Sequence, residues 1–385
     1  MKYSLTLGLV SLSLITTAQP NIHWSVLTQM PVADGAIQQV GLAGASSGVH
    51  NGVLLIAGGA NFEEQLPWEG GVKKYFDDVY VLYQIEKDTF RWAKKTYKLS
   101  QKVAYAATVS TSYGVLCVGG ENEKKLSDDV FLLQWDAQNQ QINQMSLASL
   151  PQPLSNASAT VVGAYVYVMG GETKNETLTS FYRLNLSSKT ALWEKLPNIP
   201  IALSHAVAVT QSNGQYPCIY LFGGRAKTES GISKLYNSTF CFDINKNRWK
   251  KKKNISHKNR ALPALSAGSG VSLGDFQVLL IGGDKGMVFT QIETYNANIA
   301  AESDGAIKER LQAQKVALLE NHQGFSKDMY LYNTFKNTWL RLGEVPLMMP
   351  VTTTAIKWGD AIFISSGEIK PGIRTPNIII GKLSK

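Results

Sequence analysis

The sequence predicts an all-β protein folded as a six-bladed β-propeller. Three observations lead to this prediction: a unit repeated six times, a composition that favours strands and turns, and a strand-like segment that stands alone near the N-terminus. The 385 residues include 33 Gly, 16 Tyr, 13 Phe and 8 Trp, as expected of strands joined by tight turns. With 44% hydrophobic residues, the chain can bury the core of one large domain or of two smaller ones.

The repeat is the strongest of these observations. Each unit has an apolar strand that ends in Gly-Gly, a variable polar loop, a second strand with aromatic residues, and usually a Trp a few residues later. The apolar strands end at Gly59, Gly120, Gly171, Gly224, Gly283 and, in a Ser-Gly variant, Gly367. The next strand is marked by Trp92, Trp193, Trp249 and Trp339. In the second unit Trp135 falls inside the preceding strand. This pattern is typical of kelch-type blades, because a four-stranded sheet cannot bury both faces alone but six sheets around an axis can.

The two ends of the chain predict how the ring closes. The sixth unit stops after its third strand, near residues 378–383, and no Trp follows it. Residues 23–27 (HWSVL) match the Trp-containing fourth strands of the other units. We therefore expect the N-terminal strand to complete the last blade.

One segment breaks the pattern of strands. Residues 296–322 predict a helix, with Ile307, Leu311 and Leu318 on one face and Gln314 interrupting that face. The segment lies between strands of the fifth blade, after the loop that follows Gly283. Loops at that position overhang the central funnel of a propeller. A lid, a homodimer contact and a helical packing insert are all open interpretations.

The first residues predict the compartment. Lys2, the apolar run 5–15 and the small residues 16–18 form the pattern of a secretory signal peptide over residues 1–18. The run is too short for a membrane-spanning helix. The propeller is then the single domain 19–385. We expect it to be exported to the periplasm of a Gram-negative bacterium and not to be held in a membrane.

The cysteines, charge and histidines limit the classes of function. Cys117, Cys218 and Cys241 form no CxxC spacing and lie in apolar runs, so a disulfide framework or zinc site is not expected, although a bridge between Cys218 and Cys241 stays open. The net charge of +9 fits nucleic acid, a membrane surface or an acidic ligand. The basic run Lys250–Lys253 lacks interleaved aromatic residues, which argues against a nucleic-acid site.

A copper radical oxidase would need a Tyr–Cys cross-link and two His, and only five His are present, one of them (His23) on the closing strand. A sialidase would show Ser-x-Asp-x-Gly-x-Thr-Trp turns, and none is found.

Three stretches resemble one family. GEIKPGIRT (residues 367–375), the run from Gly35 to Phe62, and the loop PWEGGVKKY after Gly59 are similar to the bacterial N-acetylneuraminate epimerases, or sialate mutarotases. The first two stretches occur here in the opposite chain order from the family's usual form. The resemblance therefore implies a circular permutant shifted by whole blades, which a propeller tolerates because each blade contacts only its neighbours.

The resemblance implies a sialic acid mutarotase that interconverts the α and β anomers of N-acetylneuraminate. Mutarotation needs a base for the anomeric hydroxyl, an acid for the ring oxygen and a group that holds the carboxylate, but no metal, nucleotide or other cofactor. On this basis Glu368 has the acid/base role. Arg374, brought back across the loop by a turn at Pro371-Gly372, holds the carboxylate. An exposed salt bridge between Glu368 and Arg374 is the alternative interpretation.

Further contacts to a small anionic sugar are expected from the other blades. The positions equivalent to Glu368 are occupied by Ala60-Asn61, Glu121, Glu172, Arg225 and Asp284. Asn61 and Arg225 are the preferred contacts, with Trp68 and Lys74 behind them, and His205 is a further candidate. Two other functions stay open: a non-catalytic kelch propeller that binds a glycan or a protein, and a mutarotase for another keto-sugar acid.

Overall fold

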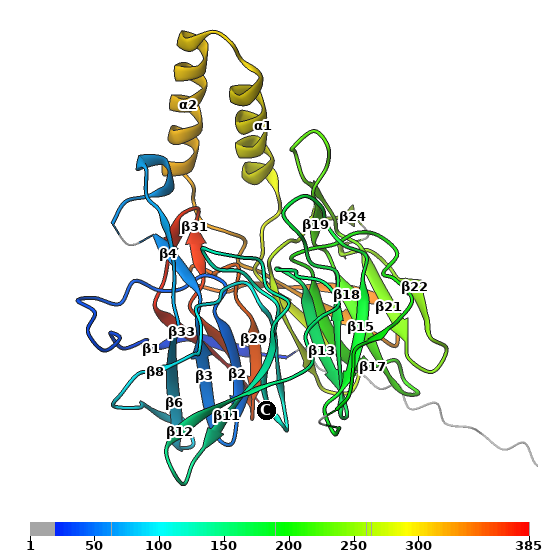
Figure 1. The fold of residues 1–385 in the computed structure, drawn as a ribbon. Helices are drawn as coiled ribbons and strands as arrows, with labels where there is room; N and C mark the ends of the chain where they lie inside the picture. Colours follow the sequence, from blue (N-terminus) through cyan, green and yellow to red (C-terminus); the bar gives the residue numbers. More distant parts are fainter. Residues whose placement is uncertain (1–19, 63, 189, 259, 263, 385) are drawn as a thin grey trace, which may run out of the picture.

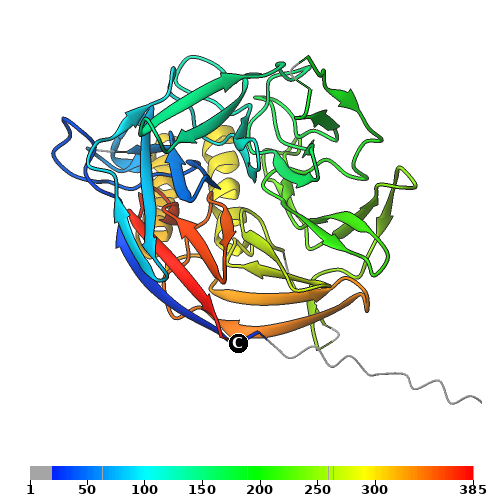
Figure 2. The same cartoon turned by 90° about the horizontal axis from the view of Figure 1, so that it is seen from below.

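The blades form a ring, as the sequence predicts. A computed structural model describes residues 20–384 apart from 63, 189, 259 and 263, so the predicted signal peptide lies outside the described residues. Within this part of the chain, six antiparallel sheets surround one axis (Figure 2). Each sheet has four strands, and the first gains a short fifth strand. The six-bladed β-propeller is therefore confirmed.

The strands of each blade follow one another in order from the axis outward. The first blade holds β2 (Ser46–His50), β3 (Val53–Ala57), β6 (Asp78–Glu86) and β7 (Thr89–Trp92), with β8 (Tyr97–Lys98) beside β6. The second holds β9 (Ala107–Thr111), β10 (Gly114–Val118), β11 (Val130–Asp136) and β12 (Gln141–Ser146). The third holds β13 (Ser158–Val162), β14 (Tyr165–Met169), β15 (Phe181–Asn185) and β16 (Glu194–Lys195).

The other three blades repeat this order. The fourth holds β17 (Val207–Ser212), β18 (Pro217–Phe222), β21 (Thr239–Asp243) and β22 (Arg248–Lys251). The fifth holds β25 (Ser269–Leu273), β26 (Gln277–Ile281), β27 (Asp328–Asn333) and β28 (Thr338–Glu344). The sixth holds β29 (Ala355–Trp358), β30 (Ala361–Ser365), β33 (Asn377–Leu383) and β1 (Ile22–Gln29).

Ring closure follows the prediction. β1 pairs antiparallel with β33, with Trp24 opposite Gly381, so the two ends of the chain share the sixth blade. The Trp24 ring lies where a side chain at position 381 would be, because a Cβ there would be 2.6 Å from the ring. Trp24 thus packs on a glycine, and its Nε1 donates to Sδ of Met329 in the fifth blade.

The hydrophobic core is divided among the blade interfaces. Within the described residues, six clusters of buried apolar side chains occur, and each joins two neighbouring blades. The second strand of a blade is covered on both faces, and all five residues of β3 and of β10 are buried. This explains why these strands are continuous apolar runs rather than alternating ones.

The glycine pairs bond one blade to the next. Gly58 and Gly59 have φ of +64° and +100°, and Gly59 N donates to Val103 O of the following blade at 2.8 Å. A Cβ on Gly58 would lie 2.2 Å from that same carbonyl oxygen. In the sixth blade Ser366 takes the left-handed position (φ +59°), and its Oγ bridges Leu42 N and Thr375 O at 2.7 Å each. The side chain of Ser366 thus supplies bonds between the first and sixth blades.

Short hairpins and a helical insert lie at one end of the propeller axis. The upper face, uppermost in Figure 1, carries β4 (Ala60–Phe62) with β5 (Lys73–Tyr75), β19 (Arg225–Ala226) with β20 (Lys234–Leu235), and β31 (Glu368–Lys370) with β32 (Ile373–Arg374). A 3-10 turn, η1 (Pro67–Glu69), lies between β4 and β5. A fourth hairpin joins β23 (Ser256–His257) and β24 (Arg260–Ala261).

The insert in the fifth blade differs from its prediction. In the described part of the chain it forms two helices, α1 (Met287–Ala301) and α2 (Gly305–Glu320), rather than one helix over 296–322. They stand on the upper face, and Figure 2 shows them behind the middle of the ring. The turn between them is set by Asp304, whose Oδ1 accepts from the N–H groups of Ala306 and Ile307 and so caps α2. α1 was missed because its aromatic and β-branched residues are weak helix formers.

Two further expectations concern cysteines and membranes. Cys117, Cys218 and Cys241 are buried free thiols, so the bridge between Cys218 and Cys241 is not formed in this structure. Neither helix of the described chain has the length and apolar character needed to span a bilayer.

Candidate functional site

The site is built from one repeated position. The residue after each glycine pair forms an isolated antiparallel bridge to the segment that enters the inner strand of its blade. The bridges pair Ala60 with Ala43, Glu121 with Ala104, Glu172 with Ser155, Arg225 with Ser204, Asp284 with Ser266 and Glu368 with Val351. All six loops therefore open on the upper face, as the sequence predicts.

The residue that follows each bridge lines the axis in a left-handed conformation. These residues are Gly44, Tyr105, Asn156, His205, Ala267 and Thr352, with φ between +53° and +64°. In the described chain, five backbone hydrogen bonds of 2.8–3.0 Å join them from one blade to the next. They surround a cavity of about 130 Å³, which we call the funnel floor. Three consecutive blades contribute large polar side chains there, and the other three contribute small residues.

Glu368 and Arg374 are direct neighbours across the β31–β32 hairpin. Their Cα atoms are paired in the sheet register, and Arg374 Nη2 lies 3.7 Å from Glu368 Oε1. The turn contains Gly372 at φ +75°, and Gly372 N donates to Glu368 Oε1 at 2.7 Å. This is the fold-back at Pro371-Gly372 that the sequence predicts. It is not an exposed surface pair, because the Arg374 side chain is only 3% exposed.

The Arg374 guanidinium is enclosed by aromatic side chains. It lies 4.7 Å from the centroid of the Phe62 ring, and its charge acts on the Tyr105 phenol, whose pKa is raised first of all by burial. Its Nε and Nη1 are buried and have no acceptor among the described residues. Buried donors without acceptors are costly, so these nitrogens favour an anionic ligand. Trp68 packs on the turn, since a Cβ on Gly372 would lie 3.2 Å from its ring.

Glu121 is held by the first, second and third blades together. Its Oε1 accepts from the Tyr75 hydroxyl at 2.9 Å, and its Oε2 accepts from Ser155 Oγ at 3.3 Å. Lys73 Nζ lies 3.8 Å from Glu121 Oε1 and 5.1 Å from the centroid of the Tyr105 ring. Burial, followed by the hydrogen bond to Glu121, raises the pKa of Tyr75, so its phenol stays protonated. Glu121 thus holds together the loops of three blades next to Tyr105.

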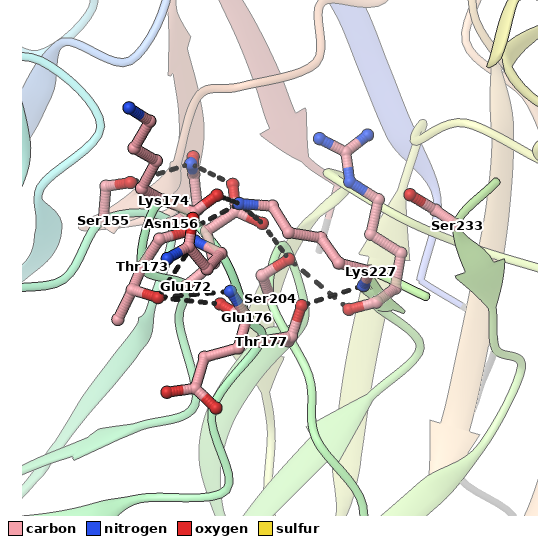
Figure 3. A network of polar contacts seen from close by, with 12 residues as sticks. Ser155, Asn156, Glu172, Thr173, Lys174, Glu176, Thr177, Ser204, Lys227 and Ser233 are labelled. Atoms are coloured by element: carbon pink, nitrogen blue, oxygen red, sulfur yellow. Dashed lines mark hydrogen bonds and ion pairs between the residues drawn. The ribbon is translucent and has the colours of Figure 1, made fainter. Parts of the chain in front are cut away.

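Glu172 is the centre of a polar network between the third and fourth blades. Figure 3 shows Asn156, Ser204 and Lys227 around it. Its Oε1 accepts from Asn156 Nδ2 at 2.9 Å and its Oε2 from Ser204 Oγ at 3.0 Å, and Lys227 Nζ lies 4.0 Å away. These contacts join two loops of the upper face, and Lys227 Nζ also donates to Thr173 O at 2.6 Å.

Arg225 and His205 form the next part of the rim. Arg225 Nη2 lies 3.1 Å from His205 Nε2, and His205 Nδ1 lies 3.0 Å from Ser204 Oγ. Burial lowers the pKa of His205 well below 6.5, and the charges of Arg225 and Lys227 add to this. The imidazole is therefore neutral, accepting from Arg225 through Nε2 and donating to Ser204 through Nδ1.

The insert reaches this rim. The Phe289 ring of α1 lies 4.4 Å from the Arg225 guanidinium carbon, and Glu293 Oε2 accepts from Ser233 N at 2.6 Å. Arg225, Glu293, Ser233 and Glu172 line a side cavity of about 300 Å³. Arg225 forms no ion pair with a carboxylate in the described residues. Burial lowers the pKa of Arg225, and the charges of Glu172, Glu293 and Asp284 oppose this effect. The side cavity thus offers both donors and acceptors to hydroxyl groups.

Asp284 and His322 lie on the fifth-blade side. Burial raises the pKa of Asp284, against the effects of the Gly286 N–H bond and the charges of Arg225 and His322. Burial lowers the pKa of His322, which is also near Glu368. The described residues hold no group of three or more His, Cys, Asp or Glu placed to bind a metal ion.

Two of the predicted contacts, Asn61 and Lys74, have protein partners in the structure. The Asn61 side chain is buried, and its Nδ2 donates to Val40 O and Gly41 O at 2.7 and 2.9 Å. It therefore holds a backbone turn instead of facing the funnel. Lys74 points away from the funnel and forms an ion pair with Glu64 at 3.1 Å, because strand alternation in β5 turns Lys73 inward. Trp68 supports the Glu368–Arg374 turn from behind.

Sequence reasoning missed Tyr105, Lys73, Phe289 and His322. The repeat contained a signal for Tyr105, because it occupies the position that made His205 a candidate, two residues before the inner strand. No comparable signal existed for Phe289, since α1 itself was not predicted.

The architecture and these contacts define a class: six-bladed β-propellers with a polar funnel on the axis and a cross-strand Glu–Arg pair beside it. Within this class, the chain belongs to the N-acetylneuraminate epimerase family, whose model matches residues 6–142 and 147–385. The resemblance predicted from GEIKPGIRT is thereby confirmed.

Curated relatives and a solved structure agree with this family. The N-acetylneuraminate epimerase of Haemophilus influenzae (strain PittEE) is 26% identical over 242 residues, which cover 63% of this chain and 60% of that protein. The N-acetylneuraminate epimerase of Salmonella typhi is 27% identical over 232 residues, covering 60% and 56%. The match thus spans about 60% of the length of these relatives. A solved structure described as "Structure of YjhT" superposes with a TM-score of 0.60 at 14% identity, over 94% of this chain and 100% of that one, and shows the same fold.

Proposed function

We propose that this chain is an isomerase that interconverts the α and β anomers of N-acetylneuraminate by acid/base ring opening and closure. The observation that carries the proposal is the Glu368–Arg374 pair. It places a carboxylate 3.7 Å from a guanidinium whose Nε and Nη1 are buried without acceptors. The family and the names of the curated relatives support the same substrate.

The chemistry follows from the two groups. N-acetylneuraminate carries a carboxylate on its anomeric carbon, beside the hydroxyl and the ring oxygen. Arg374 donates to that carboxylate, and its planar fork orients the anomeric carbon. Glu368 then accepts the proton of the anomeric hydroxyl as the ring opens and returns it at closure. Gly372 N–H holds Glu368 Oε1 at 2.7 Å, so the reacting carboxylate has a fixed orientation.

The rest of the sugar extends toward the fourth blade. Arg225, with its neutral partner His205, and the side cavity with Ser233 and Glu293 present donors and acceptors that match a polyhydroxylated tail. This keeps Arg225 and His205 as substrate contacts. Glu121 and Glu172 act indirectly, because their hydrogen bonds hold together the loops that surround the site.

Two alternatives are carried from the sequence. A non-catalytic propeller that binds a glycan or a protein would need no buried acid/base pair, and the enclosed Glu368–Arg374 pair favours an enzyme. A mutarotase for another keto-sugar acid would use the same pair, and the family name favours N-acetylneuraminate.

The test is proton NMR of α-N-acetylneuraminate, freshly released by a sialidase, with and without the purified protein. We expect a faster approach to the anomeric equilibrium. Glu368→Gln should abolish the acceleration, because the amide keeps the acceptor for Gly372 N–H but cannot take a proton. A matched control, Glu309→Gln on the exposed side of α2, should keep it. A rate equal to the spontaneous one would refute the sialate assignment.

Export is part of the proposal. The signal-peptide pattern of residues 1–18 supports a periplasmic enzyme, and cell fractionation with detection of the processed N-terminus tests it. The permuted blade order stays a prediction from the two motif stretches.

A further inference from the structure

The sixth blade departs from the repeat at the first position of the glycine pair. The other five blades have glycine there, at Gly58, Gly119, Gly170, Gly223 and Gly282. The sixth blade has Ser366, which is buried and has a left-handed φ of +59°. A residue with a Cβ is disfavoured in this conformation, so serine has a cost here that glycine would not have. The exception lies two residues before Glu368, in the blade that carries the Glu368–Arg374 pair.

Four other blades share a direct hydrogen bond at this level. In the first blade, the N–H group of Val103 in the next blade donates to Phe76 O at 3.3 Å. The following three blades have the same bond at 3.1–3.2 Å, from Leu154 to Ser127, from Leu203 to Leu178 and from Leu265 to Tyr236. The equivalent groups at the sixth blade are Leu42 N and Thr375 O, because Thr375 N donates to Gly367 O as Phe76 N donates to Gly59 O.

The Ser366 hydroxyl is inserted into this bond. Leu42 N donates to Ser366 Oγ at 2.7 Å, and Ser366 Oγ donates to Thr375 O at 2.7 Å. A hydroxyl group therefore lies between two backbone groups that bond directly in the four other blades. The strand that carries Arg374 and Thr375 is spaced from the first blade by this hydroxyl.

Two further features agree with a wider spacing at this junction. A Cβ on the first glycine of blades one to four would lie 2.0–2.4 Å from a carbonyl oxygen of the next blade, whereas Ser366 has a Cβ at that position. On the other side of Thr375, a Cβ on Gly41 would lie 2.5 Å from Thr375 C. The equivalent residues of the four other junctions all carry side chains: Lys102, Pro153, Ala202 and Ala264. The Thr375 peptide thus occupies space that a side chain at position 41 would need.

The segment on the Gly41 side is also fixed. Asn61 Nδ2 donates to Gly41 O at 2.9 Å and to Val40 O at 2.7 Å. Thr375 therefore lies between the Ser366 hydroxyl and a turn that Asn61 holds. Arg374 Nε and Nη1 have no acceptor among the described residues, so the backbone at residues 374–375 determines where these donors point.

We infer that Ser366 is a positioning residue for Arg374, an inference that rests on the proposed mutarotase function. Its hydroxyl spaces the Arg374–Thr375 strand from the first blade, so that the free guanidinium donors meet the substrate carboxylate beside Glu368. Glycine at position 366, as in the other five blades, would let Leu42 N bond directly to Thr375 O. The strand would then move toward the first blade, and Arg374 would move with it.

The experiment is Ser366→Gly in the full-length protein, with anomer exchange of N-acetylneuraminate followed by NMR. Because the repeat has glycine at this position in five blades, the urea midpoint should stay near the wild-type value. We expect kcat/KM to fall about tenfold to 100-fold, the range for a binding group that is misplaced by about 1 Å. An active wild-type protein with Ser366→Gly within threefold of it would overturn the positioning role alone.

Thr334→Val is the matched control. Thr334 is also buried, and its Oγ1 donates to Ser212 O at 2.6 Å and to Phe276 O at 3.1 Å, which joins the fourth and fifth blades at the end opposite to the upper face. Valine keeps the shape and removes the hydroxyl. The urea midpoint should fall while kcat/KM stays at the wild-type value. An equal loss of kcat/KM in this variant would show that any lost bond between blades affects activity, and would overturn the specific role of Ser366.

A double-mutant cycle tests whether Ser366 acts through Arg374. Ser366→Gly added to Arg374→Lys should lower kcat/KM less than about twofold, because lysine lacks the planar fork that the spacing serves. Two effects that multiply in full would contradict this.

A crystal structure of Ser366→Gly tests the spacing itself. It should show Leu42 N bonded to Thr375 O, and an unmoved Thr375 would overturn the role of Ser366 even without an activity measurement. A wild-type protein without activity would instead overturn the mutarotase function.

Discussion

At the residue scale, the site depends on which atoms are left without partners. Arg374 has two buried nitrogens with no acceptor among the residues that the structure describes, whereas Asn61 and Glu172 use their polar atoms on neighbouring groups. Substitution at Arg374 should therefore affect the ligand more than the fold. Substitution at Asn61 should affect the fold more than the ligand.

Arg374→Lys tests this distinction. Lysine keeps the charge but not the planar fork, so we expect KM for N-acetylneuraminate to rise about tenfold or more, the effect of losing charge-assisted hydrogen bonds worth about 1.5–3 kcal/mol. The urea midpoint should change little. Arg310→Lys, on the exposed side of α2, serves as the control. An unchanged KM would show that Arg374 does not hold the carboxylate.

His205 predicts a dependence of stability on pH. Its folded-state pKa lies well below the 6.5 of the unfolded chain, so the unfolded chain binds the proton first as the pH falls. The stability is fully present above about pH 6.5. It should fall by up to about 1.4 kcal/mol per pH unit below that value, until the folded-state pKa is reached.

The measurement is urea unfolding at a series of pH values from 8 to 5. His205→Asn should show a flatter loss below pH 6.5 than the wild type, with the remaining slope due to His50 and His322, whose pKa values are also lowered by burial. His23→Asn, at an exposed position of β1, should keep the wild-type slope. Equal slopes for all three proteins would contradict the buried neutral state of His205.

The pairing of Glu368 with Arg374 was predictable, but its surroundings were only partly so. Glu368 and Arg374 were predicted from the resemblance of GEIKPGIRT to the family, and the Pro-Gly turn between them implied the hairpin that brings them together. Lys73 and Lys74 are adjacent, and only the observed register of β5 decides which of them faces the funnel. The repeat contained a signal for the position of Tyr105, two residues before the inner strand, but its left-handed backbone is required by no local residue pattern, so the direction of its side chain could not be predicted.

At the element scale, the helical insert completes the rim of the funnel. Its two helices bury little of their own surface, with only Leu319 buried among their described residues. Their contacts to the propeller are instead polar and aromatic, through Phe289 and Glu293. An element attached in this way is suited to shaping a ligand site. The sequence predicted helix here but not a hairpin of two helices; the Ser303-Asp304-Gly305 stretch, whose Asp304 caps α2, carried the signal for the break and was not used.

Phe289→Leu measures the contribution of the insert. The leucine fills similar space but loses the contact with the Arg225 guanidinium, worth about 0.5–1 kcal/mol. We expect KM to rise about two- to fivefold while kcat stays near the wild-type value, because the reacting groups are on the sixth blade. Phe335→Leu, at an exposed position beside β27, is the control. A lower kcat with unchanged KM would place Phe289 closer to the chemistry than the structure does.

At the scale of the whole molecule, each blade interface is both a core and a set of backbone bonds. The repeat, the closing strand and the position of the insert were all predicted, because each rests on a short pattern that recurs around the ring. The six left-handed residues that surround the funnel floor were not predicted, because Gly, Tyr, Asn, His, Ala and Thr share no side-chain property. Only their backbone role is common to them: in the described chain, they provide hydrogen bonds across five of the six junctions between neighbouring blades.

The glycine pairs give the sharpest test of this interface. Gly58 and Gly282 occupy equivalent positions with φ of +64° and +68°, so alanine at either one carries the same left-handed penalty of about 1–2 kcal/mol. Their surroundings differ. A Cβ at position 58 would lie 2.2 Å from the Val103 carbonyl oxygen, whereas at position 282 its nearest neighbour would be 3.4 Å away, at Met349 Cβ. Gly58→Ala must also displace the carbonyl that accepts from Gly59 N.

We therefore expect Gly58→Ala to lower the free energy of unfolding by about 1–3 kcal/mol more than Gly282→Ala, the range for overpacking a tight contact. Urea unfolding of the two variants beside the wild type measures the difference. Equal losses would mean that the glycine is needed for its backbone angle alone. A larger loss at position 58 would mean that glycine is needed there also because the Val103 carbonyl of the next blade packs directly against it.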